Sequence, residues 1–339
     1  MIHYVEIFVR YSFIGSLFPP CAYQYFYTKF MLIFNSFADI ETSNITKPIN
    51  MKIFTRLLFL VILLLPFVAL AQLTGKVYDN LTMPSKILKS DRKYAVYLPP
   101  DFETSDRSYP VLYLLHGAGD DQTGWVQFGE VLNITDKAIA DGTATPMVII
   151  MPDGNTGRRG YFNDIKGDWN YEDFFFKELM PYVEKKFRIK NDKRYRAIAG
   201  LSMGGGGTFM YALHHPELFS SACPLSAAVG PLTLDDARAA YTKNNPGLAD
   251  SVIVNYYNQH SALALINNMP DAQKKAVRWY IDDGDDDFLY EGNCLVHIAM
   301  RKKEIPHEFR IRDGAHTWTY WRASLPAVLE FVSQAFHQY

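Results

Sequence analysis

The stretch "AIAGLSMGGGGTFMYAL" (residues 197–213) carries an apolar run, one serine and four consecutive glycines. Within it, Gly200-Leu201-Ser202-Met203-Gly204 matches the pattern G-x-S-x-G, which marks a serine at a sharp turn between a strand and a helix. The residues that flank such a turn approach the neighbouring strand and helix so closely that glycine is required. The stretch therefore predicts a strand that ends near Gly200, a helix that begins after Ser202, and a serine hydroxyl exposed between them.

The G-x-S-x-G pattern is not unique to catalytic serines. An ordinary glycine-rich helix start or a phosphate-binding turn would give similar letters. Because an apolar strand and a helix are both predicted here, the sequence favours a catalytic nucleophile at Ser202. A serine hydroxyl is a weak nucleophile by itself, so this hypothesis requires a general base and an acid that orients the base.

The chain after Gln72 alternates short apolar runs with amphipathic ones, which predicts one doubly wound α/β domain with a mostly parallel sheet and helices on both faces. Several runs are apolar at every position, as is typical of buried parallel strands. Helices are predicted at 171–187 and 325–336. A polar, helical insertion at 231–275 is expected to lie across the carboxyl edge of the sheet, where ligands bind in such folds. Strands are predicted at 93–99, 109–116, 146–152, 195–200, 276–281 and 307–312.

The base and the acid are expected after the serine, because the chain order Ser, Asp or Glu, His is usual in this architecture. His316 stands in "FRIRDGAHTWTYW", on a loop that follows a predicted strand, and it is the histidine placed to meet Ser202. The preceding strand leads into "WYIDDGDDDFLYEGN", where one aspartate is expected to be buried against His316. The residues themselves do not select among Asp282, Asp283, Asp285, Asp286 and Asp287.

Backbone N–H groups are expected to stabilise the oxyanion that forms when a serine attacks a carbonyl group. The glycine-rich turn in "LYLLHGAGDDQTGW" (112–125) follows a predicted strand. Ala118 in this turn and Met203 at the start of the helix are predicted to supply the two donors. Several aromatic residues are candidates for binding an aromatic acyl group or a sugar, but packing accounts for each of them equally well. They are Trp125, Trp169, Tyr290, Trp318 and Tyr320.

Together these segments resemble the esterase branch of the α/β-hydrolases. This branch includes feruloyl and acetylxylan esterases (carbohydrate esterase family 1), enterochelin-type siderophore esterases, S-formylglutathione hydrolases and mycolyl transferases. The resemblance covers nearly all of residues 72–339. It implies an α/β-hydrolase fold and a serine esterase without a cofactor. The matching stretches are "YAVYLPPDF", "YPVLYLLHGAGDDQTGW", "AIAGLSMGGGGTFMYALHHPELF", "DDGDDDFLYEGN" and "DGAHTWTYWRASLP".

The resemblance also implies which aspartate orients the histidine. The G-x-x-D-x-L pattern of the family aligns Asp287 with the catalytic acid, and Asp283 is the alternative. An H-x-W-x-x-W ending begins at His316 and supports it as the base. Many relatives have glycine where this chain has Ala118, a change that a backbone donor tolerates. The insertion at 231–275 matches the family poorly, so it leaves the substrate open.

A secretory signal peptide is predicted to begin at Met51. Residues 51–71 ("MKIFTRLLFLVILLLPFVALA") combine early positive charges, an apolar run and an A-x-A site, which predicts cleavage after Ala71 and a secreted or periplasmic protein without stable membrane association. We interpret residues 1–50 as an upstream over-extension. The alternative is that Met1 is the true start and that residues 55–71 are an uncleaved anchor.

The composition is that of a globular protein, with 48% hydrophobic and 21% charged residues. A formal net charge of -2 and the lack of a basic stripe argue against a nucleic-acid partner. Cys223 and Cys294 lack metal-ligand spacing, so no zinc site is predicted. Both lie in apolar runs, which favours free thiols over a disulfide between them. The sequence leaves the oligomeric state open.

The predicted function is hydrolysis of a carboxylic ester through an acyl-enzyme. Export and the resemblance imply a feruloyl or acetyl ester of a plant polysaccharide as the substrate, and the cytosolic substrate S-formylglutathione is disfavoured. The alternatives are a siderophore ester as the substrate, transfer of the acyl group to a sugar hydroxyl, and a binding protein without catalysis. The intact serine, aspartate and histidine set argues against the last of these.

Overall fold

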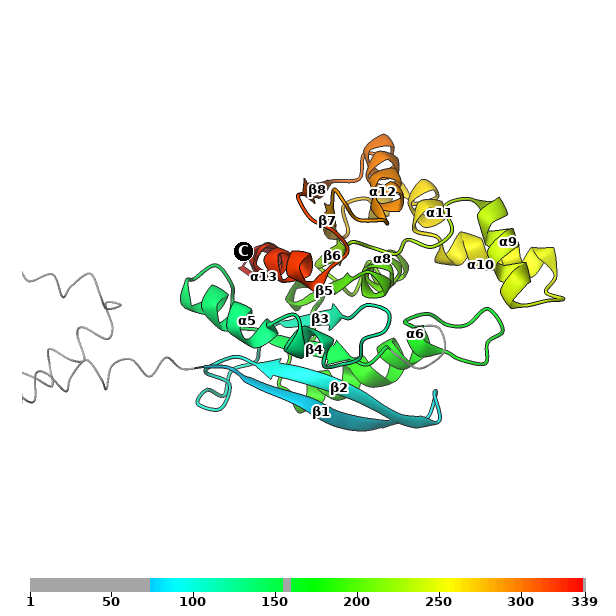
Figure 1. Ribbon diagram of the computed structural model, residues 1–339. Helices are drawn as coiled ribbons and strands as arrows, with labels where there is room; N and C mark the ends of the chain where they lie inside the picture. Colours follow the sequence, from blue (N-terminus) through cyan, green and yellow to red (C-terminus); the bar gives the residue numbers. More distant parts are fainter. Residues whose placement is uncertain (1–73, 155–159, 338–339) are drawn as a thin grey trace, which may run out of the picture. The chain divides into compact units, whose positions relative to one another are not determined.

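The computed structural model describes residues 74–154 and 160–337, and within them eight strands form one sheet (Figure 1). The strand order is β1-β2-β4-β3-β5-β6-β7-β8. β1 and β2 run antiparallel to their neighbours, while β4, β3 and the four strands beyond them are parallel. The prediction of a mostly parallel α/β sheet is confirmed. The strands are β1 (Lys76–Ser85), β2 (Ser90–Leu98), β3 (Val111–Leu115), β4 (Val148–Pro152), β5 (Arg196–Leu201), β6 (Ser221–Leu225), β7 (Arg278–Gly284) and β8 (His307–Arg312).

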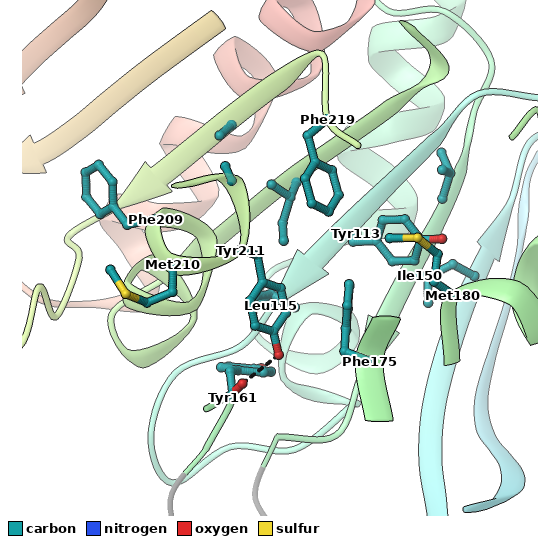
Figure 2. Close-up of a cluster of buried hydrophobic side chains, with 14 of the residues drawn as sticks. Tyr113, Leu115, Ile150, Tyr161, Phe175, Met180, Phe209, Met210, Tyr211 and Phe219 are labelled. Carbon is teal, nitrogen blue, oxygen red and sulfur yellow. Dashed lines mark hydrogen bonds between the residues drawn. The ribbon is translucent and has the colours of Figure 1, made fainter. Parts of the chain in front are cut away.

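Side chains of the parallel strands alternate between two buried faces, as the pleat of a strand requires. Tyr113, Leu115 and Ile150 belong to the core on one face, which is covered by α6 (Tyr171–Phe174), η3 (Phe175–Leu179), α7 (Met180–Lys186), α8 (Met203–His214) and α12 (Tyr290–Lys302). Figure 2 shows this core, in which the Tyr211 hydroxyl donates a hydrogen bond to the carbonyl of Tyr161 (2.6 Å). The second core lies on the other face, against α4 (Gly124–Gln127), α5 (Val131–Ala140) and α13 (Trp318–His337). The sheet is therefore covered by helices on both faces.

The helix predicted at 171–187 is present but is interrupted. It consists of α6, a π-helical turn (η3) and α7, whose first turn contains Pro181. Proline has no N–H to donate to the preceding helical turn, and a wider π turn accommodates that loss. The helix predicted at 325–336 begins earlier than expected, since α13 starts at Trp318.

The insertion at 231–275 is helical, as predicted. It forms α9 (Leu234–Asn244), α10 (Asp250–His260), α11 (Ala262–Asn267) and a short 3-10 helix, η5 (Asp271–Gln273). Its contacts extend along α8 as far as the end of that helix, where the Nε2 atom of His214 is 2.6 Å from the carbonyl oxygen of Gln259. Figure 1 shows α9 and α10 (yellow) beyond α8. The insertion thus packs beside a helix that covers the sheet. It also meets the loop after β6, at the carboxyl edge where it was expected to lie, since a Cβ atom on Gly230 would be 3.7 Å from the carbonyl oxygen of His260.

The predicted signal peptide (51–71) and the preceding residues 1–50 lie outside the described residues. None of the helices in 74–154 and 160–337 is long and apolar enough to cross a bilayer. Cys223 is buried in β6, Cys294 is half-buried in α12, and both are free thiols. This agrees with the interpretation of the two cysteines as unpaired.

Candidate active site

Ser202 lies at the turn between β5 and α8, at the carboxyl end of the strand. Its backbone has φ 53° and ψ -115°, a conformation that residues with a side chain rarely adopt. Three backbone hydrogen bonds hold it: its N–H donates to the carbonyl of Leu225 (2.9 Å), and its own carbonyl accepts from Gly206 (3.0 Å) and Ala228 (2.9 Å). The strand-turn-helix geometry predicted from G-x-S-x-G is confirmed, and the strained residue is fixed on both sides.

The glycines beside Ser202 are required by close backbone contacts. A Cβ atom on Gly200 would lie 2.5 Å from the carbonyl oxygen of Gly204. A Cβ atom on Gly204 would lie 2.6 Å from the carbonyl oxygens of both Leu115 and His116. Such distances are shorter than any van der Waals contact, so the first turn of α8 can approach β3 and β5 only without these side chains.

His316 and Asp287 complete a continuous hydrogen-bonded chain with Ser202. The Nε2 atom of His316 is 2.9 Å from Ser202 Oγ, and its Nδ1 atom is 2.7 Å from Asp287 Oδ2. The Asp287 carboxylate is buried, and its other oxygen accepts the N–H of Leu289 (2.8 Å). An acceptor carboxylate at Nδ1 favours the tautomer with the proton on Nδ1, which leaves Nε2 free to accept the proton of the serine hydroxyl.

The other aspartates of the 282–287 run have different partners. Asp282 is buried and accepts hydrogen bonds from Tyr280 (2.8 Å), Arg312 (2.6 Å) and Tyr320. Asp283 is also buried, but its Oδ1 accepts the N–H of Gly284 (3.0 Å) rather than a histidine donor. The structure therefore brings Asp287 to His316, and the alternative acid Asp283 does not contact it through any hydrogen bond among the described residues.

Burial and the nearby charge of Asp287 raise the pKa of Asp283 from 3.8 to about 7. The Oδ2 atom of Asp283 is buried and has no hydrogen-bond partner among the described residues. An uncompensated carboxylate in such a place is costly, so the protonated form is favoured at moderately acidic pH.

Backbone contacts fasten the acid loop to the histidine loop. The N–H of Asp285 donates to Arg312, and the N–H of Asp286 donates to Gly314, both at 3.0 Å. The N–H of Gly314 in turn donates to the Asp285 side chain (3.0 Å). A Cβ atom on Gly284 would lie 2.2 Å from the carbonyl oxygen of Gly314, so the two loops touch through their backbones. The position of His316 relative to Asp287 is thus set by the loops that carry them.

The turn after β3 lies beside the nucleophile. A Cβ atom on Gly117 would be 3.4 Å from Ser202 Cβ, and the next residue, Ala118, is exposed. Met203 is the first residue of α8, where backbone N–H groups have no partner within the helix. Among the described residues, no backbone hydrogen bond engages the N–H of Ala118 or of Met203. Both groups of the predicted oxyanion site are therefore available beside Ser202.

His116 is a positioning residue that the sequence reasoning missed. It is buried, its Nδ1 atom is 2.8 Å from the carbonyl oxygen of Gly117, and its Nε2 atom accepts the N–H of Gly154 (2.8 Å). Burial lowers its pKa, which keeps the ring neutral and suits one donating and one accepting nitrogen. His116 thus ties the turn that carries Ala118 to the loop after β4. Its position directly before the glycine-rich turn is the feature of the sequence that could have indicated this role.

The aromatic candidates fall into three groups: two buried residues, two half-buried residues and one exposed residue. Trp125 and Tyr320 are packing residues: the Trp125 indole donates to the carbonyl of Leu115 (3.0 Å), and the Tyr320 hydroxyl donates to Asp282 and to the carbonyl of Asp283. Trp169 is half-buried against the core, with Arg92 above its ring at 5.9 Å. Trp318 is half-buried and packs edge-on against Trp125 (5.2 Å between ring centroids). Tyr290 remains exposed on the loop side of α12.

Comparison with known proteins agrees with this geometry. The pattern of the Esterase family, described as "Putative esterase", matches residues 85–332. An esterase of Mycobacterium tuberculosis is 39% identical over 143 residues, which cover 41% of this chain and 29% of that protein. An endo-1,4-beta-xylanase/feruloyl esterase of Xylanibacter ruminicola is 40% identical over 135 residues, which cover 37% of this chain and 18% of that protein. The matches thus span less than a third of the length of these two relatives.

A solved structure of a ferulic acid esterase superposes on most of the chain. It has a TM-score of 0.68 and 36% sequence identity, and the match covers 78% of this chain and 99% of that structure. The fold, the strand-turn-helix geometry around Ser202 and the family pattern point to one assignment. The chain belongs to the Esterase family and carries a carboxylic ester hydrolase domain of the α/β-hydrolase fold.

Proposed function

We propose that this protein is an exported serine esterase that works through an acyl-enzyme. Ser202 attacks the ester carbonyl while His316 accepts its proton at Nε2. Asp287 holds the imidazole and stabilises its charged form. The tetrahedral intermediate then collapses, His316 returns the proton to the leaving alcohol, and the acyl group remains on Ser202. In the second half a water molecule gives its proton to His316 and attacks the acyl group, which releases the acid and restores Ser202.

The N–H groups of Ala118 and Met203 are proposed to bind the oxyanion in both halves of the reaction. Met203 lies at the N-terminus of α8, where the helix dipole also favours negative charge. Removing one such donor typically costs about 3 kcal/mol of transition-state stabilisation. The observation that carries the proposal is the hydrogen-bonded chain from Ser202 through His316 to Asp287 on a strained turn.

The proposed substrate is an acylated plant polysaccharide that carries feruloyl or acetyl esters. The similarity to a ferulic acid esterase over 99% of that structure supports it, and so does the stretch shared with a xylanase/feruloyl esterase. The predicted signal peptide at residues 51–71 supports a substrate outside the cytosol. A siderophore ester, or transfer of the acyl group to a sugar hydroxyl, would use the same residues.

Turnover of the purified protein on a panel of esters tests this proposal. The panel contains p-nitrophenyl acetate, methyl ferulate, acetylated xylan and a catecholate siderophore ester, with Ser202→Ala as the control. We expect hydrolysis of methyl ferulate or acetylated xylan that the variant loses, while both proteins unfold at similar temperatures. Turnover of the siderophore ester alone would mean that the substrate is a siderophore ester rather than an acylated polysaccharide. Unchanged activity in the Ser202→Ala protein would refute the mechanism.

A further inference from the structure

The outer side of His316 is covered by a side chain that the proposed mechanism does not use. Two aromatic rings of the described residues contact the imidazole. Trp321 is buried, stands perpendicular to it with centroids 4.9 Å apart, and donates its N–H to Ser226 (3.0 Å). Phe288 has its centroid 4.5 Å from that of His316, yet 71% of it is exposed. Trp321 therefore supports the histidine from inside, and Phe288 presents an open ring to solvent.

Phe288 is held in this place by the turn that positions the acid. Its neighbours on both sides are fixed, because the N–H of Leu289 donates to the Asp287 side chain (2.8 Å) and the N–H of Tyr290 donates to the Asp287 carbonyl (3.1 Å). An apolar ring left in water on a fixed turn contributes little to folding, since it buries little surface. Exposed aromatic residues beside a reactive group are typical of binding sites.

Two other exposed aromatic residues are connected to this site, one through the sequence and one through a series of ring contacts. Tyr290, two residues further, is 55% exposed. On the opposite side, ring contacts run from His316 through Trp321 and Trp318 to Phe128, which is 46% exposed. Of the large exposed aromatic residues in the described chain, only Tyr78 on β1 lies elsewhere, at the other edge of the sheet.

The chemistry of the proposed reaction indicates which half of the ester passes this ring. His316 must return its proton from Nε2 to the leaving oxygen, so that oxygen lies within hydrogen-bond reach of the imidazole, about 2.6–3.2 Å. The group attached to the leaving oxygen then lies against whatever covers the outer side of the ring. The acyl group stays on Ser202 and extends away from the departing alcohol.

We infer that Phe288 is a specificity residue that binds the alcohol half of the substrate, and that this alcohol is a sugar whose C–H face packs on the exposed ring. The inference rests on the proposed esterase function and deepens it. It assigns the recognition of the leaving sugar to the loop that also carries the acid Asp287, so substrate selection and proton transfer share one rigid turn.

Matched esters test this inference. The substrates are methyl ferulate and a feruloylated arabinoxylan oligosaccharide, which share the acyl group, and methyl acetate, which shares the alcohol with methyl ferulate. In Phe288→Ala we expect kcat/KM for the oligosaccharide ester to fall about tenfold, mainly through KM, while both methyl esters stay within about twofold. Phe288→Trp should retain the oligosaccharide activity, and Tyr78→Ala, an exposed aromatic at the other edge, should leave all three unchanged.

Three results would overturn the inference. An equal loss on methyl ferulate and on its oligosaccharide ester would mean that Phe288 acts on His316 itself. A loss on methyl ferulate but not on methyl acetate would place the acyl group on the ring. No change on any ester would mean that Phe288 touches no substrate.

A binding measurement separates this inference from the proposed function. The ester-free arabinoxylan oligosaccharide is titrated into the Ser202→Ala protein with and without Phe288→Ala. Affinity that depends on Phe288 supports the sugar site even if no ester is hydrolysed. Affinity that is the same in both proteins contradicts it even if the esterase activity is present.

Discussion

Two buried carboxyl groups lie four residues apart behind His316, and they have different environments. Asp287 contacts the imidazole and the N–H of Leu289, so both of its oxygens have donors. Asp283 has one oxygen on the N–H of Gly284 and one without a partner among the described residues. The two groups are close in sequence, yet burial and the nearby charge of Asp287 raise the pKa of Asp283 to about 7.

Asp287→Asn should abolish most of the esterase activity, whereas Asp283→Asn should keep most of it. The asparagine at 287 cannot stabilise the imidazolium and favours the wrong tautomer, which lowers kcat about 10⁴-fold in comparable triads. The measurement is kcat on p-nitrophenyl acetate for both variants. If Asp283→Asn lost activity as completely as Asp287→Asn, the acid would be a pair rather than Asp287.

Asp283 should also make the stability of the protein depend on pH. Its folded pKa, about 7, lies above its ordinary value of 3.8, so the folded state binds more protons between these values and stability falls as pH rises through that window. The loss amounts to at most about 4 kcal/mol. Asp283→Asn removes it, so the variant should gain stability relative to the natural protein from pH 4 to pH 8. Urea unfolding at both pH values measures this, and parallel curves would disprove the assignment.

At the residue scale, local sequence patterns predicted the serine and the histidine, whereas the acid Asp287 was selected only by the family resemblance. The pattern G-x-S-x-G and the position of His316 directly after a predicted strand can each be recognised within a short stretch of sequence. The five aspartates of the 282–287 run are chemically identical, and their burial depends on how the loops after β7 and β8 meet. Only the family alignment favoured Asp287. Phe288 was missed because an exposed ring has no signal of its own in a sequence.

Glycine allows the first turn of α8 to pack directly against the backbone of the sheet. Gly204→Ala should destabilise the protein by about 3 kcal/mol or more, because the new Cβ meets backbone atoms of β3 and the following turn that cannot move independently. Gly142→Ala is the matched control. Gly142 has φ +74° and open space around it. Its replacement by alanine should therefore destabilise the protein only through backbone strain, by about 1–2 kcal/mol. Equal free energies of unfolding for the two variants would contradict the close packing of α8.

At the element scale, the predicted strands include several that are buried on both faces and also the edge strand β8, whose side chains are half-buried or exposed. β3, β4 and β5 are buried at every position, and their ends fall within two residues of the predicted ones. β1 was missed because it pairs with β2 alone and most of its side chains are exposed. β6 was missed because Ser221 and Pro224 interrupt its apolar run. Tertiary pairing, rather than local propensity, makes these two segments strands.

At the scale of the whole molecule, the described residues form one unit of two cores around one sheet, while the predicted signal peptide lies outside them. Expression of the full chain in a bacterium with a secretion pathway tests the export proposal. We expect the exported protein to begin at Gln72, as determined by N-terminal sequencing. Retention in the cell with residues 55–71 intact would favour the uncleaved anchor instead.

The order of the strands could be predicted from the fold family, but the course of the insertion along α8 could not, because its own sequence matches the family poorly.

Mass spectrometry of a trapped acyl-enzyme tests whether Ser202 is the nucleophile that carries the acyl group. The protein is mixed with methyl ferulate, quenched in acid within the first turnovers, and digested with a protease. We expect a feruloyl group on the peptide that contains Ser202, and none in the Ser202→Ala protein, which should also lack turnover. Hydrolysis of the ester without any acyl group on Ser202, or with the group on another residue, would show that Ser202 is not the nucleophile.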